Sequence, residues 1–200
     1  MIQRLGGLLA AFVVLAAFVA PPAMASDDRY AVGDSVMLGA RSNLKKAGFG
    51  VDATESRQAY TGPALLRKKG NRLPSNVVVH LGTNGTYPLS TCKALVKAAG
   101  PDRRVFLVTV HVPRSWHKSN NRTIRACADA FAPGRVQVVD WDALASKHPS
   151  WLYSDRIHLK PAGAAAFARL IDTAVDDAVE RARIDALAHA AGTGKAGLLS

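Results

Sequence analysis

The alternation of strand-like and helix-like segments constrains the fold of this chain more than any other feature. The clearest segment is Val77–Leu81, an apolar and mainly β-branched run that ends at Gly82, as is typical of a strand buried on both faces. Further strand-like runs lie at residues 29–32, 49–53, 105–110 and 136–139. Apolar residues at helical spacing separate or follow them, at residues 36–47, 61–69, 90–99, 120–131 and from Pro161 to about residue 189. This order predicts an α/β fold in which a parallel sheet lies between helices.

Five strands of this kind predict a flavodoxin-like three-layer sandwich whose parallel sheet has the order 2-1-3-4-5. In that order the first and third strands are neighbours, and ligands bind in the crevice at their carboxyl ends. The first strand runs into Gly33-Asp34-Ser35 and the third into Gly82-Thr83-Asn84. We therefore expect Ser35 and Asn84 to lie at one crevice.

The first 25 residues have the layout of a secretory signal peptide. Arg4 supplies a positive charge, an apolar run follows from Leu5 to Ala20, and Ala23-Met24-Ala25 is a small-x-small cleavage site. A membrane anchor is the alternative, but this run is shorter than the roughly 20 residues that a spanning helix needs. We expect cleavage near Ala25 and a secreted or periplasmic, extracytoplasmic location. The predicted organisation is a signal peptide at 1–25, one domain at 26–191 and a flexible tail at 192–200.

The chain has two cysteines, Cys92 and Cys127. In an exported protein this number fits one disulfide bond. The predicted helices after the third and fourth strands share one face of the sheet, which brings the two cysteines within reach of each other. Such a bridge closes a loop of about 36 residues and contributes roughly 3–4 kcal/mol in the chain-entropy model. Two separate buried thiols are the alternative.

The formal net charge is +11 at pH 7, and the basic residues are dispersed along the chain. A strongly basic chain often binds nucleic acid, but the predicted export argues against that partner. A polyanionic polymer of the cell envelope or an anionic lipid surface is a better match for an exported cationic protein. A solvated basic surface without a particular ligand is the alternative. We expect a monomer.

Residues far apart in the sequence supply the groups of a serine nucleophile site. Ser35 stands where a strand meets a helix, so its backbone N–H can point at a substrate oxygen with the helix dipole behind it. His158 is the candidate general base, and Asp155 can orient its ring and stabilise its charged form. Asn84 offers a side-chain amide to a developing oxyanion. No further His, Asp or Glu stands at metal-ligand spacing beside this pair, so we expect neither a metal nor another cofactor.

These blocks resemble the SGNH/GDSL hydrolase superfamily. The segments that carry the resemblance are Gly33-Asp34-Ser35-Val36, Gly82-Thr83-Asn84 and Asp155-x-x-His158. The resemblance implies a flavodoxin-like sandwich and ester chemistry without a metal. It also implies that Ser35 is the nucleophile, His158 the base, Asp155 its partner and Asn84 an oxyanion donor. It covers essentially the whole predicted mature chain.

A closer likeness is to the extracytoplasmic SGNH domain of peptidoglycan O-acetyltransferases. It rests on the stretches Ser56-Arg57-Gln58, Val112-Pro113-Arg114-x-Trp116, Val139-Asp140-Trp141 and His148-Pro149-x-Trp151. The general family has a glycine oxyanion donor in its second block, and we place Arg57 at that position. The backbone N–H of Arg57 is therefore a third oxyanion candidate. A hole formed only by the Ser35 N–H and Asn84 is the alternative.

Three further residues are candidates for substrate binding. Trp116 and Trp151 are expected in loops near the crevice, where each stacks on a sugar ring or packs against the edge of the sheet. Arg114 is expected to contact an anionic group of a glycan or to be solvated. His80 lies inside an apolar strand and is expected to be a hydrogen-bonded core histidine.

Together these features predict an exported serine esterase or O-acyltransferase that forms an acyl-enzyme at Ser35. Its predicted substrates are O-acetyl groups of cell-envelope carbohydrate, or another small ester. The acetyltransferases that it resembles usually carry a membrane domain that delivers the acetyl group, and no such domain is recognisable in this sequence. We therefore expect either a separate membrane protein as acyl donor or water as acceptor. A non-catalytic basic wall-binding module and a short-chain lipid esterase are the alternative functions.

Overall fold

The computed structural model describes residues 28–196, so the predicted signal peptide lies outside the described residues. Its centre is a five-stranded sheet with the order β2-β1-β3-β4-β5, and neighbouring strands pair in parallel. The strands are β1 (Arg29–Gly33), β2 (Gly50–Ala53), β3 (Asn76–His80), β4 (Arg104–Val108) and β5 (Val136–Val139). The predicted α/β class and the predicted strand order are both confirmed.

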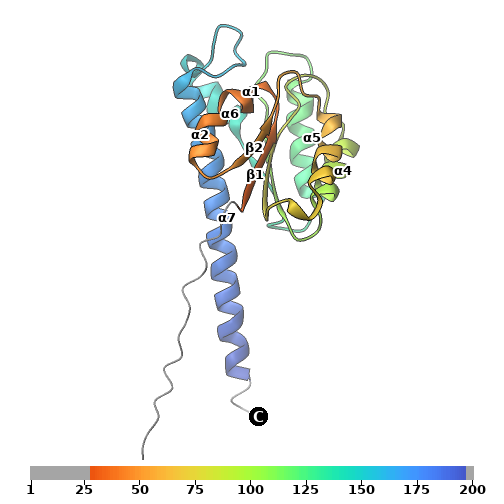
Figure 1. Ribbon diagram of the computed structural model, residues 1–200, viewed down its shortest axis with the longest axis vertical. Helices are drawn as coiled ribbons and strands as arrows, with labels where there is room; N and C mark the ends of the chain where they lie inside the picture. Colours follow the sequence, from red (N-terminus) through yellow and green to blue (C-terminus); the bar gives the residue numbers. More distant parts are fainter. Residues whose placement is uncertain (1–27, 197–200) are drawn as a thin grey trace, which may run out of the picture.

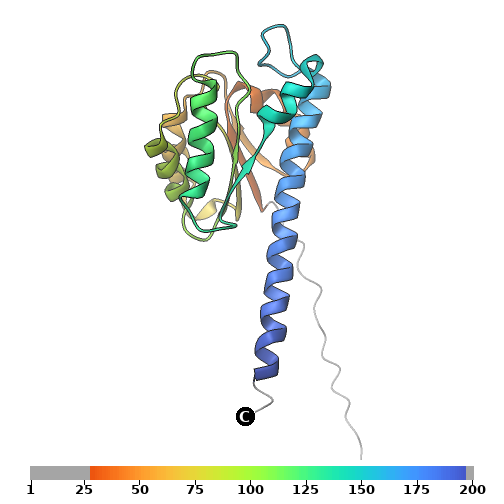
Figure 2. The same cartoon turned by 180° about the vertical axis from the view of Figure 1, so that it is seen from behind.

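Helices cover both faces of the sheet, as Figures 1 and 2 show. One layer consists of α1 (Ser35–Gly39), α2 (Arg41–Lys46), α6 (Trp141–Lys147) and α7 (Pro161–Ala196). The other consists of α3 (Gly62–Lys69), α4 (Leu89–Ala99) and α5 (His117–Asp129). Short 3-10 turns lie at Ala59–Thr61, Gly70–Arg72 and Pro149–Trp151.

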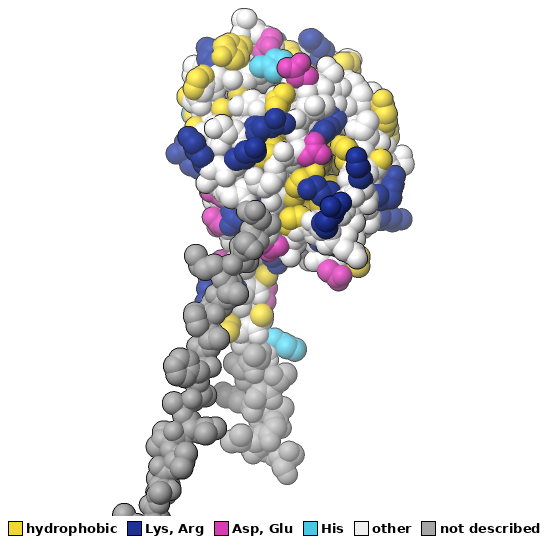
Figure 3. Space-filling view, viewed as in Figure 1, with side chains coloured by type: hydrophobic (Ala, Val, Ile, Leu, Met, Phe, Trp, Pro, Cys, Tyr) yellow, Lys and Arg dark blue, Asp and Glu magenta, His cyan; other side chains and the backbone are white. Residues whose placement is uncertain are grey.

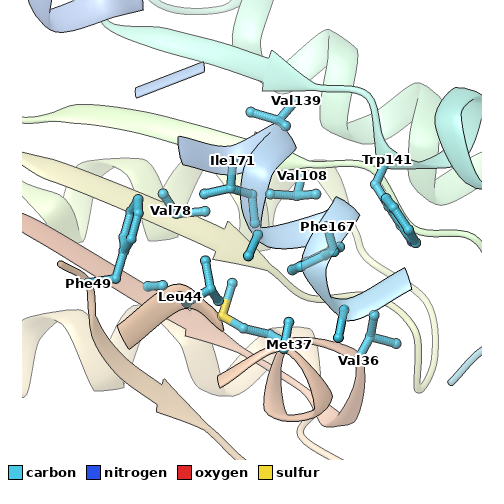
Figure 4. Packing of buried hydrophobic residues seen from close by; sticks show 14 of the residues in the cluster. Val36, Met37, Leu44, Phe49, Val78, Val108, Val139, Trp141, Phe167 and Ile171 are labelled. Atoms are coloured by element: carbon cyan, nitrogen blue, oxygen red, sulfur yellow. The ribbon is translucent and has the colours of Figure 1, made fainter. Parts of the chain in front are cut away.

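Each helical layer buries its own apolar cluster against the sheet. Met37, Phe167 and Ile171 belong to the cluster beneath α1 and α7, which Figure 4 shows from close by. Leu95 and Ile124 belong to the cluster beneath α4 and α5. Both faces of the sheet are thus covered by packed helices, which makes a three-layer body.

The central strand β3 shows why its sequence is a continuous apolar run. Val78 packs into the cluster beneath α7, whereas Val77 and Val79 pack into the cluster beneath α4 and α5. Every residue of β3 is buried. A strand covered on both faces has no solvent-facing positions, so the usual alternation of apolar and polar residues is absent.

The structure differs from the sequence prediction in the first helical segment. The predicted helix at 36–47 is divided at Ala40, whose φ of −93° and ψ of 2° end α1 and allow α2 to begin at Arg41. Both pieces pack on the same apolar cluster, through Met37 of the first and Leu44 of the second.

A second difference is α6, a helix that the sequence does not predict. Asp140 caps it by accepting a hydrogen bond from the backbone N–H of Ala143 at 3.3 Å, and Trp141 at its first position is buried. The helix is seven residues long, which is shorter than the window of about 11–18 residues in which helical periodicity is recognisable.

The disulfide between Cys92 in α4 and Cys127 in α5 is present, which confirms the predicted pairing. Helix α7 begins at Pro161, as predicted, and runs to Ala196, past residue 192 where the sequence indicates a tail. Its second half extends away from the body of the domain (Figure 1). None of the described helices combines the length and the apolar character needed to cross a bilayer.

Candidate active site

The segment Gly33–Ser35, here called the nucleophile turn, joins β1 to α1. Asp34 is the N-cap of α1 and accepts a hydrogen bond from the backbone N–H of Val36 at 3.1 Å, which leaves Ser35 as the first helical residue. Gly33 is required here, because a Cβ at this position would lie 2.5 Å from the Cβ of Met37. The turn therefore presents the Ser35 hydroxyl at the carboxyl end of the sheet.

His158 and Asp155 meet Ser35 in the arrangement of a catalytic triad. His158 Nε2 lies 3.0 Å from Ser35 Oγ, and His158 Nδ1 lies 2.6 Å from Asp155 Oδ2. The other carboxylate oxygen of Asp155 accepts hydrogen bonds from the backbone N–H groups of Ile157 at 2.8 Å and His158 at 3.0 Å. The two sequence segments, 123 residues apart, thus converge as predicted.

The electrostatics of this triad favour an ionised carboxylate. Partial burial acts to raise the pKa of Asp155, but the hydrogen bonds from the His158 ring and from the backbone of Ile157 and His158 hold it below its usual range. The side chains of His158 and Asp155 are 47% and 43% exposed. Both side chains are therefore accessible from solvent.

A pocket of about 460 Å³ lies in front of Ser35. Its lining residues are Ser35, Leu38, Gly39, Glu55, Ser56, Asn84 and His158. Ser35 and Asn84 therefore share one crevice at the ends of β1 and β3, where the strand order predicts a ligand site.

The segment Gly82–Gly85, here called the amide turn, carries Asn84 and is held by Asn120 of α5. The Asn120 amide donates to the backbone oxygens of Gly82 and Gly85, both at 2.8 Å. Its carbonyl oxygen accepts from the backbone N–H of Tyr87 at 2.8 Å. Asn120 is buried, so its position fixes the amide turn relative to the α5 layer.

Arg57, the third oxyanion candidate, is placed differently from the other two. Its guanidinium donates to the backbone oxygens of Gly33 at 3.1 Å and Asp52 at 2.6 Å, and pairs with the Asp52 carboxylate at 2.7 Å. Its backbone oxygen accepts from the Asn84 amide at 3.3 Å. Arg57 thus clamps the ends of β1 and β2, and an oxyanion role for its backbone N–H stays a prediction.

Ser56, which precedes Arg57, is a pocket residue for which the sequence predicts no role. It lines the pocket and has a φ of 56°, in the left-handed region that glycine adopts most readily. The left-handed backbone position in this segment therefore falls on Ser56 and not on Arg57. Glycine usually marks a left-handed position in a sequence, and a serine at this position does not.

Two of the three substrate-binding candidates share one loop, and the third lies elsewhere. Trp116 is half-buried, and its Nε1 donates to the backbone oxygen of Thr83 at 3.3 Å, beside the amide turn. Arg114 is exposed on the same loop. Trp151 stacks on His148 with ring centroids 3.9 Å apart and lines a different, largely apolar groove against α7. The structure therefore brings Trp116 near the site and does not place Trp151 in the Ser35 pocket.

A buried pair lies directly behind the site. His80 Nδ1 is 3.2 Å from Asp34 Oδ1, both side chains are fully buried, and Asp34 Oδ2 accepts from the backbone N–H of Thr83 at 3.4 Å. This confirms that His80 is a hydrogen-bonded core histidine. The Asp34 carboxylate thereby connects the nucleophile turn with the amide turn.

Basic side chains are spread over the face of the domain shown in Figure 3, in separate groups with acidic residues between them. One group, Lys68, Lys69 and Arg72, lines a pocket of about 300 Å³ together with Tyr30 and Asp52. A dispersed arrangement of this kind agrees with the dispersed basic residues of the sequence.

This chain is similar in sequence to several known proteins. No protein-family model matches the chain. YrhL of Bacillus subtilis is 32% identical over 154 residues, and the alignment covers 75% of this chain. The peptidoglycan O-acetyltransferase OatA of Listeria monocytogenes is 32% identical over 150 residues, and the O-acetyltransferase OatA of Staphylococcus aureus is 31% identical over 149. The chain spans about a quarter (24%) of the length of each of these relatives.

Solved structures match the fold. The C-terminal catalytic domain of the peptidoglycan O-acetyltransferase OatA from Streptococcus pneumoniae superposes with a TM-score of 0.69 at 24% identity, over 78% of this chain and 96% of that one. The chain has the SGNH hydrolase fold. Other SGNH-type neighbours include a family 3 carbohydrate esterase from Talaromyces cellulolyticus, with a TM-score of 0.59 at 16% identity, covering 76% of this chain and 99% of that one. The homologues of this SGNH domain are thus peptidoglycan O-acetyltransferases, and its structural neighbours include acetyl and carbohydrate esterases.

Proposed function

We propose that this chain is an extracytoplasmic serine esterase or O-acetyltransferase that acts on O-acetyl groups of cell-envelope carbohydrate through an acyl-enzyme at Ser35. The observation that carries the proposal is the pair of short contacts at His158, 3.0 Å to Ser35 Oγ and 2.6 Å to Asp155 Oδ2. A hydroxyl, an imidazole and a carboxylate at these distances form the group that activates serine as a nucleophile.

In the first half-reaction, His158 Nε2 removes the proton of Ser35 Oγ as that oxygen attacks the carbonyl carbon of the ester. The backbone N–H of Ser35 and the side-chain amide of Asn84 stabilise the negative charge on the carbonyl oxygen. Asp155 stabilises the imidazolium that forms on His158. When the bond to the alcohol breaks, His158 returns the proton to the leaving oxygen, and the acetyl group stays on Ser35.

In the second half-reaction, His158 removes a proton from the acceptor, whose oxygen attacks the acetyl carbon. The bond from that carbon to Ser35 Oγ breaks, and His158 returns the proton to Ser35 Oγ. Water as acceptor gives acetate, whereas a sugar hydroxyl gives an acetylated glycan. The names of the relatives support the sugar hydroxyl, and the names of the esterase neighbours support water. For transfer, we propose that a membrane protein supplies the acetyl group.

The nucleophile is tested with p-nitrophenyl acetate and the full chain. Ser35→Ala is expected to lower kcat by at least about 10⁴-fold, as is usual when the nucleophile of a triad is removed. The matched control is Ser90→Ala, an exposed serine in α4 on the other side of the sheet, which is expected to keep the wild-type rate. A fluorophosphonate is expected to add to Ser35 in the wild-type chain. Unchanged turnover in Ser35→Ala, or the lack of an adduct, favours the wall-binding alternative.

The acceptor is tested by incubating the protein with an acetyl donor and a chitooligosaccharide. Mass spectrometry then shows whether the sugar gains an acetyl group or whether free acetate alone appears. Acetyl gain that is lost in Ser35→Ala supports an O-acetyltransferase. Acetate alone supports an esterase, and preferential hydrolysis of a short-chain lipid ester supports the lipid alternative.

A further inference from the structure

A second convergence of polar side chains lies outside the Ser35 pocket. His111 follows β4, His117 is the first residue of α5, and Asp142 lies in the first turn of α6. One nitrogen or oxygen of each residue lies within 4.8 Å of the others. The sequence does not link the three, because Asp142 is 31 residues from His111 and comes from another element.

The three groups meet at a single carboxylate oxygen. His111 Nδ1 lies 2.7 Å from Asp142 Oδ1, and His117 Nε2 lies 2.8 Å from the same oxygen. His117 Nε2 is buried, and no acceptor or donor among the described residues is aligned with it for a hydrogen bond. Two imidazole nitrogens thus converge on one oxygen, and one of them is left without an aligned partner.

The carboxylate is oriented by neighbours that leave Oδ1 facing the histidines. Asn121 donates to Asp142 Oδ2 at 3.0 Å, and the backbone N–H of Asp142 donates to Thr109 Oγ1 at 2.9 Å. Supporting hydrogen bonds of this kind are what fixes the ligands of metal sites in proteins. The side chains of the three residues are 20–25% exposed, so a small ion can enter from solvent.

We propose that His111, His117 and Asp142 bind one divalent transition metal ion, with Zn²⁺ as the best match. Two imidazoles and one carboxylate, with a fourth position open to water, form a donor set that zinc uses. Calcium and magnesium prefer oxygen ligands throughout. Tetrahedral ligands at zinc bond lengths lie about 3.4 Å apart, so each nitrogen moves back from Asp142 Oδ1 by roughly half an ångström to admit the ion.

The bound ion connects the two ends of one loop to α6. The loop from His111 to His117 contains the exposed Arg114 and carries Trp116, whose Nε1 contacts the amide turn. An ion held by both histidines and by Asp142 therefore limits the motion of this loop beside the Ser35 pocket. The proposed metal site uses none of the triad residues, so its test is independent of the proposed esterase chemistry.

The test is Zn²⁺ binding to the full chain, measured by competition with a fluorescent chelator and repeated in Ser35→Ala, which keeps the metal ligands. Wild type and Ser35→Ala are both expected to bind one Zn²⁺ per chain. His117→Gln and Asp142→Asn are each expected to weaken binding at least about 100-fold, the upper end of the loss seen when supporting residues of a metal site are removed. His148→Gln, which alters a histidine outside the cluster, is expected to bind Zn²⁺ like wild type.

A second readout reports on the loop itself. Zn²⁺ at 100 times its Kd is expected to raise the Tm by roughly 5–10 °C and to slow amide hydrogen exchange in residues 111–117. Both effects are expected to be absent in the double variant His111→Gln/His117→Gln. No saturable one-to-one binding in wild type, or equal binding in the double variant, overturns the proposal.

Discussion

Replacing Asp34 with alanine tests how the candidate site is held together. Its carboxylate is fully buried and contacts the backbone N–H of Val36, the backbone N–H of Thr83 and the ring of His80. These contacts cap α1 and join the nucleophile turn to the amide turn. The variant is therefore expected to lose both stability and activity, although Asp34 itself does not line the pocket.

The magnitude follows from the contacts that are lost. Removing an N-cap side chain costs about 1 kcal/mol. Leaving the Thr83 N–H and the His80 ring unpaired in the interior costs roughly 1–3 kcal/mol each, with Thr83 at the low end because its contact is long at 3.4 Å. The free energy of unfolding is thus expected to fall by about 3–5 kcal/mol. A displaced oxyanion donor lowers kcat by about 10²–10³-fold.

The assay is urea unfolding combined with hydrolysis of p-nitrophenyl acetate under conditions in which each variant is folded. Asp34→Asn is the matched control, because asparagine also caps helices and keeps an acceptor oxygen toward Val36. It is expected to lose less than half as much stability as the alanine variant. An alanine variant within 1 kcal/mol (about one hydrogen bond) of wild type, with unchanged kcat/KM, would refute the idea that Asp34 couples the two turns.

Three further predictions concern other parts of the molecule. Replacing both Cys92 and Cys127 with alanine is expected to lower the free energy of unfolding by roughly 3–4 kcal/mol, measured by urea unfolding against the oxidised wild type. Asp155→Asn is expected to lower kcat by about 10⁴-fold with an intact fold by circular dichroism, because the His158 ring loses its orienting charge. Partial burial acts to raise the pKa of Asp52, but the Arg57 guanidinium holds it below its ordinary value. That pair therefore stabilises the fold above about pH 4 and the contribution is lost as the pH falls further, so Asp52→Asn is expected to flatten the acid side of the stability profile.

The parts of the fold that the sequence predicts are those that depend on long or locally encoded patterns. Val77–Val79 reads as a buried strand because helices cover both faces of β3. Pro161 marks the start of α7 because proline fits the first turn of a helix. The Asp155–His158 pair is recognisable because its contact spans only three residues.

The parts that the sequence does not predict depend on contacts between distant segments or on single backbone angles. The break at Ala40 depends on the backbone angles of one residue, and the left-handed φ of Ser56 has no glycine to mark it. The convergence of His111, His117 and Asp142 requires the positions of three elements at once. None of these has a local pattern of residues from which it can be read.

The position of His158 depends on α7 as much as the position of Ser35 depends on the sheet. Leu152 and Leu159 form an antiparallel bridge, and the backbone N–H of Tyr153 donates to the oxygen of His158 at 2.9 Å. These two contacts close residues 152–159, which include His158, into a short loop directly before α7. Because Phe167 of α7 packs edge-on against His80, the same helix reaches the buried pair behind Ser35. A shift of α7 along the sheet would therefore move the imidazole and disturb the support of the nucleophile together, which ties the geometry of the triad to the packing of the core.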